Sequence, residues 1–164
     1  MSFRTGDRVA GKIAIVTGAA AGIGRASALR LAQEGALVCL SDIDQSGAEK
    51  GAAEIRACGG EALSLAHNVA EEVDWRRVID ATLERFGGLN ILVNNAGIAF
   101  AAGLEDTTTE QWRGIMAVNV DGVFFGCKTA LPAMRESGGG AIVNMSSILG
   151  LVGSPVQAAY NATK

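Results

Sequence analysis

The amino-acid sequence predicts an α/β fold: a doubly wound parallel sheet of five strands in the order 3-2-1-4-5, in one domain over residues 1–164. Three observations lead to this prediction. Short apolar runs alternate with longer amphipathic stretches along the chain. The run at residues 89–93 (LNILV) is apolar without interruption, as in parallel strands that helices cover on both faces. A glycine-rich turn follows the first apolar run directly, and 164 residues are enough for a domain with a hydrophobic core.

The first strand is expected over residues 13–17 (IAIVT), followed by a helix from about Gly22. A small-residue face of Gly24, Ala28, Leu31 and Gly35 would let that helix lie close against the sheet. A strand at 36–41, a helix at 45–57, a strand at 61–66 and a helix ending near residue 86 come next. After the strand at 89–93, helical spacing predicts a long helix over about 109–136. The glycines at 138–140 end it before a fifth strand at 141–145 (AIVNM).

Composition excludes several classes of function. A net charge of −3 without a basic run gives nucleic-acid binding little support. His67 is the only histidine and no Cys/His cluster has metal-ligand spacing, so we expect no metal site, no zinc-dependent dehydrogenase and no serine-histidine-acid triad. Three widely spaced cysteines and no signal-peptide core favour a cytoplasmic protein. No apolar stretch is expected to approach the roughly 18 residues that a membrane span needs.

The glycine-rich turn, residues 17–24 (TGAAAGIG), lies between a strand and a helix, where backbone N–H groups can hold a pyrophosphate. Asp42 ends the second strand, at the distance where an acid binds the adenosine ribose hydroxyls and repels a 2′-phosphate. No Arg or Lys lies within residues 17–24 or directly after Asp42. The pattern predicts a Rossmann-type domain that binds NAD. Alternatively, Asp42 is a polar loop residue or the cap of the following helix.

Four further motifs occur in order: residues 94–97 (NNAG), Asn119 in MAVNVDG, Ser147 in VNMSS, and Tyr160 with Lys164 in YNATK. With these motifs the chain resembles the short-chain dehydrogenase/reductase family, in its single-domain branch of roughly 250 residues. The resemblance runs from Gly11 onward. It implies a catalytic tetrad of Asn119, Ser147, Tyr160 and Lys164. Ser147 is chosen over Ser146 because it precedes Tyr160 by 13 residues, the usual family offset.

The resemblance also implies a set of cofactor-binding residues: Gly18, Ala21, Gly22, Ile23, Gly24, Asp42, Ile43, Asn68, Val69, Asn95, Ala96, Gly97, Tyr160 and Lys164. One position departs from the family, which commonly has Asp-Val where this chain has Asn68-Val69 against the adenine. An amide can both donate and accept hydrogen bonds, so adenine binding should survive. His67, next to it, is expected to be a surface or loop residue rather than a catalyst.

Tyr160 and Lys164 are four residues apart, so they share a helical face. A nearby ammonium favours the phenolate, which lowers the pKa of a tyrosine from about 10. The implied reaction is NAD-dependent interconversion of a secondary alcohol and a ketone, with Tyr160 as general acid/base and Ser147 bonded to the same substrate oxygen. Lys164 would also bond the nicotinamide ribose, and Asn119 would support a water. Apolar residues at 98–103 and 149–157 favour a hydrophobic, cyclic or steroid-like alcohol.

The sequence stops at the predicted catalytic lysine, so we expect it to be C-terminally truncated relative to this family, with the last strands missing. We therefore expect strand five to be an exposed edge, Lys164 to lack neighbours that fix it, and this chain to be inactive or nearly so. Full-length members suggest a homotetramer. The alternatives are a non-catalytic dinucleotide-binding or interaction module, an NADP-dependent ketoacyl-type reductase, and an epimerase or dehydratase with bound NAD.

Overall fold

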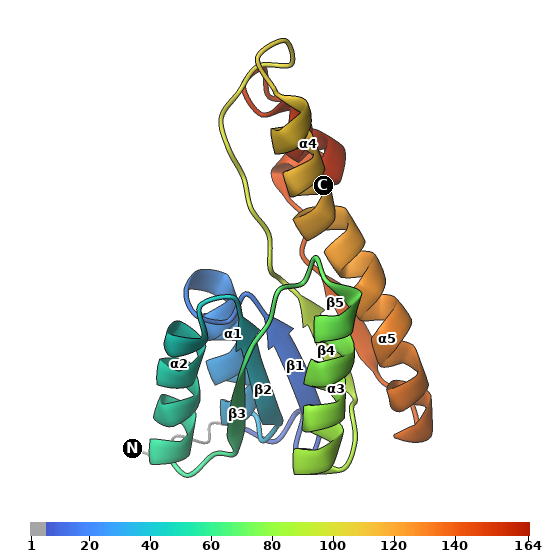
Figure 1. Ribbon diagram of the computed structural model, residues 1–164. Coiled ribbons are helices and arrows are strands. Elements are labelled where there is room, and N and C mark those ends of the chain that lie inside the picture. Colours follow the sequence, from blue (N-terminus) through green and yellow to red (C-terminus); the bar gives the residue numbers. More distant parts are fainter. Residues whose placement is uncertain (1–5) are drawn as a thin grey trace.

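The computed structural model describes residues 6–164, which form a parallel sheet with helices on both faces (Figure 1). The sheet order is β3-β2-β1-β4-β5, as predicted. The strands are β1 (Ile13–Thr17), β2 (Leu37–Asp42), β3 (Ala62–Ala66), β4 (Ile91–Asn94) and β5 (Ala141–Asn144). The α-helices are α1 (Gly22–Gln33), α2 (Gln45–Ala57), α3 (Glu72–Phe86), α4 (Thr109–Met116), α5 (Gly122–Glu136) and α6 (Ala158–Thr163). The predicted strand limits differ from these by two residues at most.

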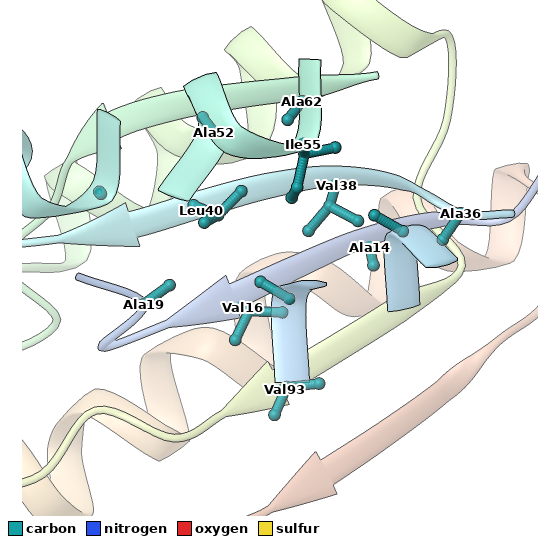
Figure 2. Close-up of a cluster of buried hydrophobic side chains, with 13 residues drawn as sticks. Ala14, Val16, Ala19, Ala36, Val38, Leu40, Ala52, Ile55, Ala62 and Val93 are labelled. Carbon is teal, nitrogen blue, oxygen red and sulfur yellow. The ribbon is translucent and has the colours of Figure 1, made fainter. Parts of the chain in front are cut away.

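Alternate residues of each central strand feed two separate cores, which is the physical basis of the doubly wound architecture. On β1, Ala14 and Val16 join a core under α1 and α2, drawn in Figure 2, whereas Ile15 joins a core under α3 and α5. The first core is built largely from alanines and valines. The fully buried residues of α1 are Gly24, Ala28 and Ala32, and Leu31 packs against the same core from a partly buried position, as predicted. Gly35 lies beyond the end of α1, so its prediction on this helical face was wrong.

The helix predicted over residues 109–136 is continuous, but a π-helical turn, η1 (Ala117–Asp121), separates α4 from α5. One 18-residue window of this helix has a mean hydropathy of 1.2 and passes the length and composition test for a membrane span, with 28% of the window buried. The expectation that no stretch would reach this length was therefore wrong. Ala130, Ala133 and Met134 of α5 lie in the second core, as in a helix that covers a sheet.

Two features of the C-terminal third matter for the site. β5 pairs only with β4 among the described strands, and Val143 on it is 47% exposed, which confirms the exposed edge. Beyond the carboxyl ends of the strands, α4, α6 and the segment that leads into α4 project away from the sheet (Figure 1).

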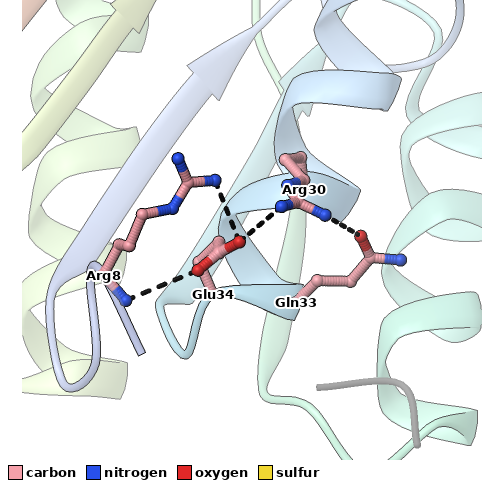
Figure 3. A network of polar contacts seen from close by, with 4 residues as sticks. All are labelled: Arg8, Arg30, Gln33 and Glu34. Atoms are coloured by element: carbon pink, nitrogen blue, oxygen red, sulfur yellow. Dashed lines mark hydrogen bonds and ion pairs between the residues drawn. The ribbon is translucent and has the colours of Figure 1, made fainter. Parts of the chain in front are cut away.

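At the C-terminal end of α1, the Glu34 carboxylate holds the N-terminal segment against the domain (Figure 3). It accepts hydrogen bonds from the backbone N–H of Arg8 (3.5 Å) and from the guanidinium groups of Arg8 (2.9 Å) and Arg30 (2.6 Å). The hydrogen bond from Arg8 lowers the pKa of Glu34 below its ordinary value.

Candidate dinucleotide and active site

The carboxyl ends of β1 and β4 are joined through the buried hydroxyl of Thr17. It donates to the carbonyl oxygen of Val93 (3.3 Å) and accepts the backbone N–H groups of Asn95 and Ala96 (3.0 Å each). Sequence reasoning did not single out Thr17, although it begins the glycine-rich turn. These bonds fix the NNAG segment beside that turn.

The glycines of the turn are required because Asn95 packs directly on them. The Asn95 side chain donates to the carbonyl oxygens of Thr17 (2.9 Å) and Gly18 (3.2 Å). A Cβ on Gly18 would lie 2.8 Å from Asn95 Nδ2, and Gly18 also has a φ of +64°. A Cβ on Gly24 would lie 2.5 Å from the same nitrogen. The segment at 94–97 and the turn therefore form one close-packed unit.

The N-terminus of α1 is open to a ligand. Ala21, its N-cap residue, has no polar side-chain atom, and the first turn contains no acidic residue. No described residue accepts the backbone N–H groups of Gly22 or Ile23. Free N–H groups and the positive end of the helix dipole together suit an anion such as a pyrophosphate.

The Asp42 carboxylate is positioned at the end of β2 by two backbone hydrogen bonds. One oxygen accepts the N–H of Ala20 in the glycine-rich turn (2.9 Å), and the other accepts the N–H of Asp44 (3.0 Å). The cap of α2 is Asp44, which accepts the N–H of Gly47 (3.0 Å). Asp42 is therefore not the helix cap, and its carboxylate lies beside the turn.

A cavity of about 440 Å³ runs along this edge of the sheet. It brings together most of the predicted cofactor-binding residues, namely Gly18, Ala21, Asp42, Ile43, Asn68, Val69, Asn95, Ala96 and Gly97. Ala20, Asp44, His67, Ile98 and Val118 complete its lining, which contains neither Arg nor Lys. Gly22, Ile23 and Gly24 lie outside this lining, at the start of α1.

His67 lies in the loop that follows β3, which agrees with the expectation of a surface or loop residue only in part: it is buried, with 3% of its surface exposed, and is not a surface residue. Its Nδ1 is 3.0 Å from the Ser41 hydroxyl, and its ring meets that of Trp75 edge to face at 4.4 Å. Burial lowers the pKa of His67 to about 4. The imidazole is thus a neutral part of the wall behind the cavity.

Tyr160 and Lys164 line a second, smaller cavity of about 180 Å³. Ile23, Asn95 and Gly97 also line it, so it adjoins the first cavity. The Lys164 ammonium lies 5.6 Å from the centre of the Tyr160 ring and donates to the carbonyl oxygen of Met145 (3.0 Å). Lys164 therefore has partners that hold it, contrary to the expectation.

The Asn119 side chain lies in the π-helical turn and is buried with both its polar groups bonded, as a buried amide requires. Its oxygen accepts the N–H of Ile98 (2.9 Å), and its nitrogen donates to the carbonyl oxygen of Ile98 (2.9 Å) and to the Thr163 hydroxyl (3.0 Å). Asn119 thereby connects the segment after NNAG to α6, which carries Tyr160 and ends directly before Lys164. Single π-helical turns are frequent at functional sites.

Ser147 and its neighbour Ser146 lie in different places relative to Tyr160. Its hydroxyl accepts the N–H of Leu149 (3.2 Å) at the start of a short 3-10 turn, η2 (Ile148–Gly150). The cavity of Tyr160 is lined by Ser146 and not by Ser147. The assignment of Ser147 remains a prediction from the family offset.

Asn161, which sequence reasoning did not single out, braces the segment after Ser147. Its side chain donates to the carbonyl oxygens of Leu149 (2.6 Å) and Val152 (2.9 Å) and accepts the N–H of Ser154 (3.1 Å). Its position inside the YNATK motif was the one feature of the sequence that could have pointed to Asn161.

Comparisons with known proteins agree with this architecture. A family model described as "short chain dehydrogenase" matches residues 12–164. The chain is 43% identical over 158 residues to 2,5-dichloro-2,5-cyclohexadiene-1,4-diol dehydrogenase of Sphingobium indicum, and 45% identical over 161 residues to the NADP-dependent (R)-specific alcohol dehydrogenase of Lentilactobacillus kefiri. Each match covers 96% of this chain and 63% of the relative. A short chain dehydrogenase/reductase of Burkholderia phymatum, solved in complex with NAD, has a TM-score of 0.90 and 32% identity, over 99% of this chain and 56% of that one.

Proposed function

This chain belongs to the short-chain dehydrogenase/reductase family, and on that premise we propose that it is the NAD-binding part of an oxidoreductase that interconverts a secondary alcohol and a ketone. We assign dinucleotide binding to this chain and catalysis to the whole protein. We also propose that the whole protein is a cytoplasmic homotetramer.

The observation that carries the choice of NAD is the Asp42 carboxylate, held beside the glycine-rich turn by the N–H of Ala20. A carboxylate there accepts hydrogen bonds from the two hydroxyls of an adenosine ribose and repels a 2′-phosphate. Asp44 adds a second negative charge to the same cavity lining, in which no cation compensates them.

The described residues along the carboxyl ends of the strands fit such a dinucleotide. The open N-terminus of α1 would hold the pyrophosphate, Asp42 the ribose, and Ile43, Asn68 and Val69 the base. Gly97 and Lys164 would lie next to the nicotinamide half of the dinucleotide. The bound nicotinamide supplies the hydride acceptor or donor; the protein supplies position and proton transfer.

For catalysis, Tyr160 would take the proton of the substrate hydroxyl, and Ser147 would hydrogen-bond the same oxygen. Lys164 would hold the tyrosine and bond the nicotinamide ribose. The bonds of Asn119 to Ile98 and Thr163 support this arrangement by fixing α6, which carries Tyr160 and ends directly before Lys164. We expect the 164-residue chain itself to turn over slowly or not at all, because the cavity of Tyr160 is small and its rim, including Ile98 and Ser146, is exposed to water.

A cyclic, apolar secondary alcohol is the favoured substrate class. Ile98 is 46% exposed, and Ile148, Leu151, Val152 and Val156 are more than half exposed in the segment between Ser147 and Tyr160. The relative from Sphingobium indicum acts on a cyclohexadiene diol, an alcohol of this kind. A steroid-like alcohol is a larger member of the same class.

Titration calorimetry of the 164-residue chain with NAD⁺ and with NADP⁺ tests the cofactor. We expect NAD⁺ to bind at least roughly tenfold more tightly, since a carboxylate facing a phosphate costs more than a lost neutral hydrogen bond. Asp42→Ala should narrow this difference, whereas Asp80→Ala, which removes the same charge from an exposed position of α3, should leave it unchanged. Equal or tighter binding of NADP⁺ by the unaltered chain would favour the NADP-dependent reductase. The relative from Lentilactobacillus kefiri is an NADP-dependent enzyme of this kind.

The catalytic part is tested on cyclic secondary alcohols with the protein as isolated from its source. Tyr160→Phe should lower turnover by roughly 10²–10⁴-fold, the usual contribution of a general acid/base, and leave NAD⁺ affinity within about twofold. Turnover that survives this substitution would refute the role of Tyr160. Tightly retained NAD without net oxidation of any alcohol would instead favour an epimerase or dehydratase.

A further inference from the structure

Residues 148–156, which lie between Ser147 and α6, form a loop that neither hydrophobic core holds. None of these residues is buried, and none belongs to either core. Leu151 on this loop is 87% exposed. A segment with so few buried contacts opens readily unless hydrogen bonds hold its backbone. The position of the loop therefore depends on its hydrogen bonds.

Three of the hydrogen bonds that hold the loop come from one side chain, that of Asn161 on α6. Its Nδ2 donates to the carbonyl oxygens of Leu149 (2.6 Å) and Val152 (2.9 Å). Its Oδ1 accepts the N–H of Ser154 (3.1 Å), and this donor identifies which end of the amide is the oxygen. The amide thus uses both its donors and its acceptor on residues 149–154.

The loop lies next to the cavity of Tyr160. At one side, Asn161 directly follows Tyr160 on α6. At the other side, the N–H of Ala102 donates to the carbonyl oxygen of Val156 (2.8 Å), which joins the loop to the segment whose Ile98 lines that cavity. Sites for small organic ligands usually enclose about 300–1,000 Å³, so this cavity of about 180 Å³ encloses only part of a larger alcohol. The remainder of the alcohol would lie beyond the rim, against the apolar side chains of the loop.

We propose that Asn161 is a positioning residue that lets this site accept large alcohols, because it holds the loop of residues 148–156 in place before the substrate binds. A wall that is already in place costs no ordering when a large alcohol binds against it. Without the bonds from Asn161, a large alcohol would have to order the loop on binding. A small alcohol that stays within the cavity of Tyr160 would not.

This inference rests on the proposed oxidation of a secondary alcohol. It goes beyond that proposal in assigning selection by substrate size to a residue that acts through the loop and does not itself contact the substrate. A bond between Asn161 and the loop places the selecting element on the same helix as Tyr160.

The test is steady-state kinetics of the whole protein and its variants with cyclopentanol and with cyclooctanol, which differ only in the size of the apolar ring. The dinucleotide that the protein binds is supplied at saturation. Asn161→Ala removes all the side-chain bonds to the loop. Asn161→Asp keeps the shape and the bond from Ser154, but it places an oxygen against the carbonyl oxygens of Leu149 and Val152. Ser154→Ala is the matched control, because it alters the same loop and keeps the backbone N–H that Asn161 accepts.

We expect Asn161→Ala to raise KM for cyclooctanol roughly tenfold, the effect of one or two lost hydrogen bonds. KM for cyclopentanol and kcat for both alcohols should stay within about twofold, because the loop acts on binding of the larger ring and not on proton transfer. Asn161→Asp should raise KM for cyclooctanol at least as much, although its side chain has nearly the same size, and Ser154→Ala should leave it unchanged. An unchanged KM for cyclooctanol in the folded Asn161 variants, or an equal rise for both alcohols, would overturn the inference and leave the proposed function standing.

The unaltered protein supplies the remaining outcomes. Oxidation of cyclopentanol but not of cyclooctanol would overturn this inference alone, whereas oxidation of neither would overturn the proposed function and this inference with it. Far-UV circular dichroism checks that each variant is folded. If neither Asn161 variant folds, hydrogen exchange in the unaltered 164-residue chain decides. The amide of Ser154 should then exchange at least roughly tenfold more slowly than that of Gly153, whose N–H has no acceptor among the described residues, and equal exchange would overturn the inference.

Discussion

Replacing Gly24 by alanine tests whether the glycine-rich turn and the NNAG segment form one packed unit. The new Cβ would lie 2.5 Å from Asn95 Nδ2 and closer still to the carbonyl oxygen of Gly18, so backbone must move. Overpacking of this kind costs about 1–3 kcal/mol. Displacing Asn95 would also break its two hydrogen bonds to Thr17 and Gly18, at about 1 kcal/mol each. Alanine recovers about 1 kcal/mol of helix propensity, so the net loss of stability should be about 3 kcal/mol.

Urea unfolding followed by tryptophan fluorescence measures this loss, since Trp75 is buried and should report on the core. Gly114→Ala is the matched control. Gly114 also lies inside a helix, but a Cβ there would meet nothing within 4 Å. We expect this variant to be unchanged or up to about 1 kcal/mol more stable. Equal stabilities for the two variants would refute the packing argument.

Two further predictions concern groups whose ionisation is tied to folding. His67 is buried and neutral, with a pKa of about 4 against an unfolded value near 6.5. Its contribution to stability is complete above pH 6.5 and lost as the pH falls toward 4, by about 3 kcal/mol in all. His67→Gln should flatten that part of the stability profile; an unaltered slope would contradict its burial. Glu34 has a lowered pKa, so its link to Arg8 holds above the ordinary glutamate range and weakens as the pH falls through the lowered value. Glu34→Gln should speed hydrogen exchange at the Arg8 amide, whereas Glu54→Gln, at the exposed Arg25 pair, should not; equal exchange in both variants would count against the link.

The fold could be read from the sequence because each part of it depends on local patterns. Apolar runs and helical spacing located the five strands, and a strand, a glycine turn and a distant acid placed Asp42 at the same edge. The errors of one or two residues at strand ends arise because hydrogen bonding to neighbouring strands, not composition, decides where pairing stops.

Other features depend on contacts between residues far apart in the chain. The Thr17 hydroxyl bonds to groups 76 to 79 residues away, and nothing near Thr17 in the sequence indicates this. His67 was expected to be a surface or loop residue, and it does lie in the loop after β3, but Ser41 on the adjacent strand and Trp75 on α3 enclose it. On α1, Ala32 is fully buried beside Ala28, whereas the larger Leu31 packs against the same core from a partly buried position.

The central claim is that a dinucleotide lies across the carboxyl ends of β3, β2 and β1, with its ribose on Asp42. The most direct test is titration of the ¹⁵N-labelled 164-residue chain with NAD⁺, followed by nuclear magnetic resonance of the backbone amides. The claim predicts that the amides of Ala20, Ile23, Asp44 and Val69 shift, while that of Cys58 at the opposite end of the sheet does not. Shifts centred on Cys58, or none at Ala20 and Val69 at saturating NAD⁺, would contradict it.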